Sequence, residues 1–196
     1  MSAEAAGGRR SHDGLSPVSC SSSGSRTLMS MNAESIRSLY GYNRWANERL
    51  RALAEALPPD RMHERLGASY ESIHATLAHI LAAEIIWLSR WRDVSPPKLL
   101  GADDFADLRA IGARWAAQQR DMDAFLGALT SDQLAKIVAY TTTMGERYAY
   151  SVWQMMVHLV NHGTHHRSEL AEMLTQLGSP PPPLDLLVYY DHLVEG

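Results

Sequence analysis

The sequence is poor in several features that would point to a particular class of protein. Its single cysteine, Cys20, excludes an internal disulfide framework and a zinc site built from several cysteines. Charged residues or histidines interrupt every window of about 20 residues, so no segment is suited to cross a bilayer. Basic residues do not cluster, and 18 Lys and Arg are outnumbered by 22 Asp and Glu, which argues against a nucleic-acid partner.

Several catalytic motifs are also missing. The chain has no glycine-rich phosphate loop, no Ser-His-Asp order, no paired carboxylates and no Glu-x-x-His repeated on two helices, the pattern of di-iron bundles. Gly163 stands where a zinc protease of the H-E-x-x-H type needs its glutamate, which disfavours a metalloprotease. The informative residues are therefore the histidines.

The composition divides the chain into two parts. A length of 196 residues suits one domain, and 45% hydrophobic residues are enough for a core. Residues 1–30 contain nine Ser, four Gly and one Pro and show no apolar periodicity, so we expect a disordered tail. We expect residues 31–196 to form the folded domain.

Four long segments have helical periodicity and end at strong stop signals. The first begins with Asn32 as a plausible N-cap, and the acidic pair Asp103-Asp104 suits the start of the third. β-branched and aromatic residues predict a small hairpin or extended excursion before the last long helix. The pattern predicts an all-α four-helix bundle. The expected long helices span about 32–57, 70–93, 103–129 and 151–177, with a short helix from 131, the excursion at 139–150 and a further short helix at 184–194.

Four of the nine histidines lie close together on the last long helix. At about 100° per residue, His162 and His166 are about 40° apart, and both lie in the apolar stripe that faces the bundle interior. Imidazoles aimed into a core either bind something or carry a desolvation penalty, and this spacing lets two of them share one metal ion. His158 and His165 fall at the edge of the stripe, where an acid–base role and simple solvation both remain open.

A metal site needs a third ligand from another helix, and the second helix offers two histidines. His74 and His79 are about 140° apart on that helix and cannot both face inward. Because the helix is apolar nearly all round, periodicity favours His79 only slightly. We expect His74, at the amino-terminal end, to be solvated.

Three further polar residues are candidates for supporting roles. Arg167 follows a possible ligand and can bind an anionic substrate group or form a surface salt bridge. Asn43 forms an i, i+4 pair with Asn47, which favours a capping or an inter-helix hydrogen-bond role over catalysis. Glu84, in an apolar helix, is either the partner of a buried arginine or an acceptor for a metal-binding histidine.

Three segments together resemble the DinB/YfiT-like family over essentially the whole of residues 31–190. They are YNRWANE at 42–48, LAHILAAE at 77–84 and WQMMVHLVNHGTHHR at 153–167. The resemblance implies a four-helix bundle that holds a divalent ion, zinc or nickel, on His79, His162 and His166. It thereby selects His79 over His74 as the third ligand.

The resemblance also implies a class of function. Characterised members use low-molecular-weight thiols in S-transfer or isomerisation, members are often homodimers, and the family name records induction by DNA damage. We therefore expect a cytoplasmic, metal-dependent thiol S-transferase with a small-molecule substrate, in which the thiol is a co-substrate because Cys20 lies in the tail. A non-catalytic metal-binding stress-response protein and a metal-dependent hydrolase remain alternatives.

Overall fold

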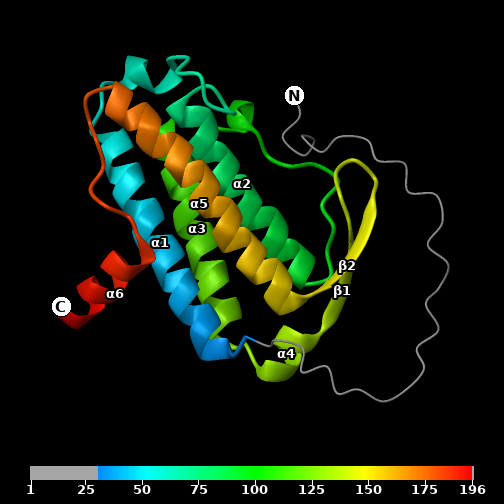
Figure 1. The fold of residues 1–196 in the computed structure, drawn as a ribbon. Coiled ribbons are helices and arrows are strands. Elements are labelled where there is room, and N and C mark those ends of the chain that lie inside the picture. Colours follow the sequence, from blue (N-terminus) through cyan, green and yellow to red (C-terminus); the bar gives the residue numbers. More distant parts are fainter. Residues whose placement is uncertain (1–30, 196) are drawn as a thin grey trace, which may run out of the picture.

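A computed structural model describes residues 31–195, and the expected tail at 1–30 lies outside these described residues. Four long helices lie side by side and confirm the all-α bundle (Figure 1). No helix in the described part of the chain is both long and apolar enough to span a membrane. The four helices are α1 (Ala33–Glu55), α2 (Ile73–Trp91), α3 (Leu108–Gly127) and α5 (Val152–Gln176).

Side-chain caps set where the helices begin. Asn32 caps α1 as predicted, because its side chain accepts a hydrogen bond from the Ser35 amide at 2.7 Å. The cap of α2 is Ser72, so this helix begins later than predicted and leaves Tyr70 in the preceding loop. The predicted start of α3 was wrong: residues 102–104 form a separate 3₁₀ turn, and the cap is Asp107.

The long helices run in two directions. Tyr40 on α1 donates to the Met156 carbonyl on α5, and further along both helices Asn47 meets Arg167, so α1 and α5 are parallel. Helices α2 and α3 run the opposite way, and the connection at 92–107 carries the chain back along the bundle between them (Figure 1). This crossover places two parallel helices, α2 and α3, next to each other.

The predicted excursion before the last long helix is a β-hairpin. Strands β1 (Ile137–Thr141) and β2 (Arg147–Ser151) pair antiparallel with Ala139 opposite Ala149. Gly145 adopts φ +83° in the turn, a conformation that favours glycine. The short helix α4 (Ser131–Ala135) precedes the hairpin, which leads directly into α5.

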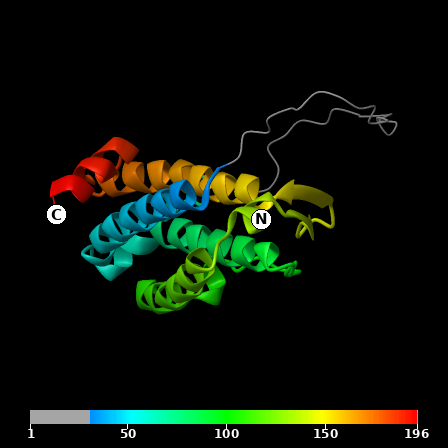
Figure 2. The same cartoon turned by 90° about the horizontal axis from the view of Figure 1, so that it is seen from below.

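The predicted tail helix is α6 (Leu186–Glu195). The hairpin and α6 lie on opposite sides of the molecule (Figures 1 and 2). Tyr189 is the buried anchor of α6, and its hydroxyl occupies the space where a side chain at Gly41 would project. Any larger residue at Gly41 would therefore push α6 away from α1.

The interior contains two apolar clusters separated by a polar layer. One cluster lies toward the hairpin and includes Ile36 and Met156, and the other lies toward the opposite end and includes Leu50 and Leu170. Between them, at mid-height on all four long helices, lie buried polar side chains. They are Asn43 and Asn47 of α1, Glu84 of α2, Gln118 of α3 and Arg167 of α5.

Candidate metal centre

Three imidazoles from two antiparallel helices converge on one point. His79 of α2 and His162 and His166 of α5 each offer a ring nitrogen within 4.8 Å of the other two. The Nε2 atoms of His79 and His162 are 3.1 Å apart. Nitrogens around a tetrahedral zinc at its usual bond length lie about 3.3 Å apart, so the His79–His162 pair matches the spacing that one ion requires.

The surroundings favour the neutral form of two of these imidazoles, His79 and His162. Burial, together with the neighbouring rings of His162 and His166, lowers the pKa of His79 to about 3. Burial and the adjacent His166 lower the pKa of His162 to about 4. A neutral imidazole has a free lone pair, which is the form that binds a metal ion.

Glu169 fixes the orientation of His166. Partial burial alone would raise the pKa of Glu169, but hydrogen bonds from Ser69 and His166 lower it, so this carboxylate is an acceptor. His166 Nδ1 donates to Glu169 Oε2 at 2.8 Å, and Ser69 donates to Glu169 Oε1 at 2.5 Å. His166 Nε2 is therefore the nitrogen left to face an ion, as in carboxylate–histidine–metal triads.

Tyr70 completes the surroundings of the three rings. Its hydroxyl lies 3.2 Å from His79 Nε2, and its ring stacks on that of His79 with 4.1 Å between ring centres. The next residue, Glu71, has φ +61°, a left-handed conformation that is strained for a residue with a side chain. This turn brings Tyr70 from the loop onto the face of α2.

Neither Glu169 nor Tyr70 was predicted from the sequence as a member of the site. The signal for Glu169 was available, because it lies three residues after His166 and so on the same helix face. Tyr70 carried no comparable signal, since its place depends on a loop that the helical periodicity does not describe.

Two of the three histidines, His79 and His162, line a cavity of about 1450 Å³. The cavity is bordered by α2, α5, the hairpin and the loops at 68–71 and 99–103. It is large enough to hold a small organic molecule against the histidines.

The other predicted site residues occupy three different environments. His158 lines the cavity with its ring against Trp87, and burial, with the nearby Arg90, lowers the pKa of His158. His165 points outward with 70% of its side chain exposed. Arg167 and Asn43 lie in the buried polar layer and do not line the cavity.

Within the polar layer, donors and acceptors are matched. Glu84 accepts hydrogen bonds from Asn43 and Asn47, each at 2.9 Å, and from the Trp115 indole at 3.0 Å. Arg167 donates to the side-chain oxygens of the same two asparagines, at 2.6 and 3.1 Å. The two asparagines thus link Glu84 to a buried arginine, one of the two roles expected for Glu84.

Gly163 leaves the room that this network needs. A Cβ at this position would lie 2.8 Å from Arg167 Nη1 and 2.9 Å from Asn43 Oδ1. The position that carries glutamate in the H-E-x-x-H pattern is therefore one where this fold has room only for glycine.

The prediction that His74 is solvated was wrong. Its side chain is buried, and its ring lies 4.7 Å from that of His63. The helical wheel describes α2 alone, whereas the 3₁₀ turn at Pro59–His63 and the residues around Phe105 cover this end of the helix. His74 remains outside the three-histidine group.

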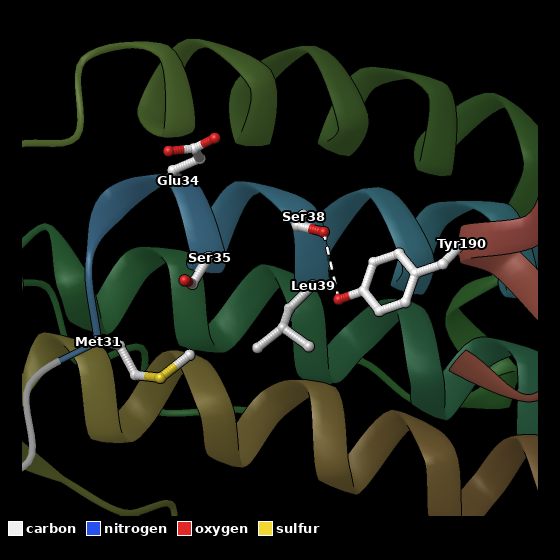
Figure 3. Close-up of a pocket in the computed structure, with 6 residues that line it drawn as sticks. All are labelled: Met31, Glu34, Ser35, Ser38, Leu39 and Tyr190. Carbon is white, nitrogen blue, oxygen red and sulfur yellow. Dashed lines mark hydrogen bonds between the residues drawn. The ribbon is translucent and has the colours of Figure 1, made fainter. Parts of the chain in front are cut away.

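A second, smaller pocket of about 420 Å³ lies between the start of α1 and α6 (Figure 3). Ser38 donates a long 3.4 Å hydrogen bond to the Tyr190 hydroxyl across it. Its lining contains one carboxylate, Glu34, and no histidine, so it lacks the convergent ligands of the larger cavity.

Comparison with known proteins places the chain in a family. The sequence profile of the DinB family matches residues 29–193, and the chain belongs to this family. It is 26% identical to Protein DinB of Bacillus subtilis (strain 168) over 161 residues, 77% of this chain and 91% of that protein. A DinB-like protein from Bacillus cereus ATCC 10987 has a similar crystal structure, with a TM-score of 0.58, 18% identity and coverage of 79% of this chain and 99% of that one. At that identity the structural likeness concerns the fold.

Proposed function

We propose that this protein is a divalent-metal-dependent transferase that activates a low-molecular-weight thiol, with His79, His162 and His166 holding the ion. The observation that carries the proposal is the convergence of three imidazoles, two of which line a cavity sized for a small molecule. Three protein ligands leave an open fourth position on a tetrahedral ion, as catalytic sites require. Zinc and nickel both suit imidazole ligands.

The proposed reaction requires sulfur from a co-substrate, because residues 31–195 contain no cysteine. When bound, a divalent ion lowers the pKa of a thiol that occupies its open position. This chemistry would let the sulfur bond to an electrophilic carbon whose leaving group departs with its electron pair, while the thiol proton would pass to solvent. The chain's own part is to hold both reactants in one cavity, beside the Tyr70 hydroxyl and the His158 ring.

Metal content is the first test. The wild-type protein, prepared without added metal or nickel chromatography, is expected to contain near one equivalent of a divalent ion by inductively coupled plasma mass spectrometry. His79→Ala, His162→Ala and His166→Ala are each expected to lose it. His165→Ala is the matched control, because this neighbouring histidine is exposed. A wild type that contains no metal and takes none up on titration would contradict the proposal.

Turnover is the second test and separates the reaction classes. The metal-loaded protein is expected to conjugate a small thiol to an electrophile such as 1-chloro-2,4-dinitrobenzene, with release of chloride. Hydrolysis of an ester or amide without thiol would instead support a hydrolase that uses bound water. Metal binding with neither reaction would support a non-catalytic role.

We further propose a cytoplasmic homodimer. Small thiols stay reduced in that compartment, which favours a cytoplasmic thiol-dependent enzyme. Helix α6 supports the dimer, because it exposes 73% of Leu187, 56% of Leu193 and 87% of Val194. Light scattering after gel filtration is expected to give a dimer for the wild type and a monomer for Leu187→Glu.

A further inference from the structure

The large cavity extends well beyond the three histidines. His79, Ala83, Ile86 and Arg90 all line it, and their spacing of four, three and four residues places them on one face of α2. The same face therefore presents a metal-binding imidazole at one end and a guanidinium at the other. Ala83, in between, is too small to divide the space.

Helix α5 provides a matching wall. His162 and His158 line the cavity one turn apart, and their ring centres are 6.1 Å from each other. The His158 ring contacts Trp87 at 5.0 Å, edge to face. A row of rings thus leads from the histidine site toward Arg90.

Arg90 is held in a fixed position at the far end of this row. Its guanidinium carbon lies 4.7 Å from the Trp87 ring centre and 4.5 Å from that of Tyr140, and these two rings meet edge to face. Only 2% of Arg90 is exposed to solvent. Contacts of this kind restrict the side chain while its planar N–H groups keep the geometry that recognises a carboxylate.

Arg90 is the buried member of the four Arg, Asp and Glu residues that line the cavity. Three carboxylates line the cavity as well, Glu71, Asp103 and Glu146, but all three residues are exposed to solvent. Glu71 is paired with Arg65. A buried charge acts through a lower dielectric than exposed ones, so the inner end of the cavity favours an anion.

We propose that Arg90 binds a carboxylate carried by the thiol co-substrate, whose sulfur occupies the histidine end of the cavity. The guanidinium lies over Trp87, eight residues after His79, which corresponds to roughly 12 Å along α2. The co-substrate is therefore an extended thiol with its acidic group at the end remote from the sulfur. This inference rests on the proposed function, because it takes the histidine end as the position of the thiol.

The test uses cobalt-loaded protein and two thiols that differ only in their far end. Binding of 6-mercaptohexanoate and 6-mercaptohexanol is followed by the sulfur-to-cobalt charge-transfer absorption. The acid is expected to bind about 10- to 100-fold more tightly than the alcohol, the value of a charge-assisted hydrogen bond. Arg90→Gln is expected to remove this preference, and Arg90→Lys to retain part of it.

Arg92→Gln is the matched control. Arg92 lies at the end of the same helix, is exposed, and donates to the Asp121 carbonyl outside the cavity. The variant loses the same charge, yet it is expected to keep the full preference for the acid. Circular dichroism and the cobalt stoichiometry verify that each variant is folded.

The outcomes separate this inference from the proposed function. Equal binding of the two thiols by the wild type, or a preference that survives in Arg90→Gln, would overturn the role of Arg90. If neither thiol changes the cobalt spectrum, the thiol proposal fails. Calorimetry with hexanoate and hexanol on the purified protein then tests whether Arg90 binds a carboxylate. Hexanoate binding that Arg90→Gln abolishes would support an anion site, and no hexanoate binding would overturn it.

Discussion

His166 and Arg167 are adjacent in sequence, yet their side chains enter two polar regions of opposite character. His166 joins two other imidazoles that line a cavity, and one ring nitrogen of each lies within 4.8 Å of the others. Arg167 enters the polar layer, where Asn43 and Asn47 accept its hydrogen bonds and donate to Glu84. Both regions are polar groups inside an apolar bundle.

The two regions differ in the partners that their polar groups require. The polar layer pairs donors with acceptors from its own chain, so it needs no ligand. The histidine site brings three imidazoles together, and a cation is a partner that all three can bind at once. A polar cluster inside a core therefore indicates a ligand when its members share one role, and structure when their roles are complementary.

The largest expected effect comes from opening the polar layer. Arg167→Met removes the cation next to buried Glu84, and we expect the free energy of unfolding to fall by about 3–5 kcal/mol in urea titrations. The folded variant is expected to keep one equivalent of metal. Loss of metal at unchanged stability would show that Arg167 serves the metal site instead.

A pH titration tests the same layer through Glu84. Burial raises the pKa of Glu84 from its usual 4.5 to about 7, although hydrogen bonds and Arg167 oppose this. The folded state therefore holds this proton more tightly, and the resulting stabilisation, complete below about pH 4.5, is lost as the pH rises through 7. The stability of the wild type relative to Glu84→Gln is expected to fall by on the order of 3 kcal/mol over this range.

Urea titrations of both proteins from pH 4.5 to 7.5, in chelator, provide the measurement. The histidines contribute with the opposite sign, because the lowered pKa values of His79 and His162 destabilise the fold as the pH falls below 6.5. Both proteins share that contribution, so it cancels in the difference. A difference that stays constant with pH would contradict the prediction.

The next effect concerns the orientation of the metal site. Glu169→Gln weakens the acceptor that holds His166 Nδ1, and we expect metal affinity to fall about 10- to 100-fold in competition with a chromophoric chelator. Glu172→Gln is the control, because this exposed carboxylate on the same helix bonds to Gln176. Equal affinities for the two variants would remove Glu169 from the site.

The smallest expected effect tests the packing between the two regions. Gly163→Ala places a methyl group against Arg167 and Asn43, and we expect a loss of about 1–2 kcal/mol in thermal or urea unfolding. Gly127→Ala at the end of α3 meets nothing within 4 Å and is expected to be neutral or stabilising. A neutral Gly163→Ala would mean that the polar layer rearranges freely.

The bundle, the hairpin and the tail helix could be predicted from the sequence alone, because apolar periodicity and stop signals are local properties of the chain. Helix starts were less predictable, since several residues compete to cap. Asp103 and Asp104 suited a helix start, but Asp107 supplies the cap of α3. The directions of α2 and α3 had no local signal.

The candidate site, too, could be predicted only as far as local helix geometry determines it. Wheel geometry placed His162 and His166 inside, whereas the choice of His79 over His74 came from family resemblance and matches the group that converges. The wheel could not show that His74 is covered by distant turns, or that Tyr70 folds over His79. Such contacts depend on segments far apart in sequence, which periodicity does not relate.

The crossover at 92–107 and the hairpin have a consequence for how this protein can diversify. The histidines stand on α2 and α5, whereas residues such as Leu99, Asp103, Thr142 and Tyr148 border the same cavity from the two connections. The three histidines and much of the cavity's border are therefore encoded in separate stretches of the gene. Insertions or exchanges in the two connections can reshape the cavity while the helical frame and its three histidines are inherited intact.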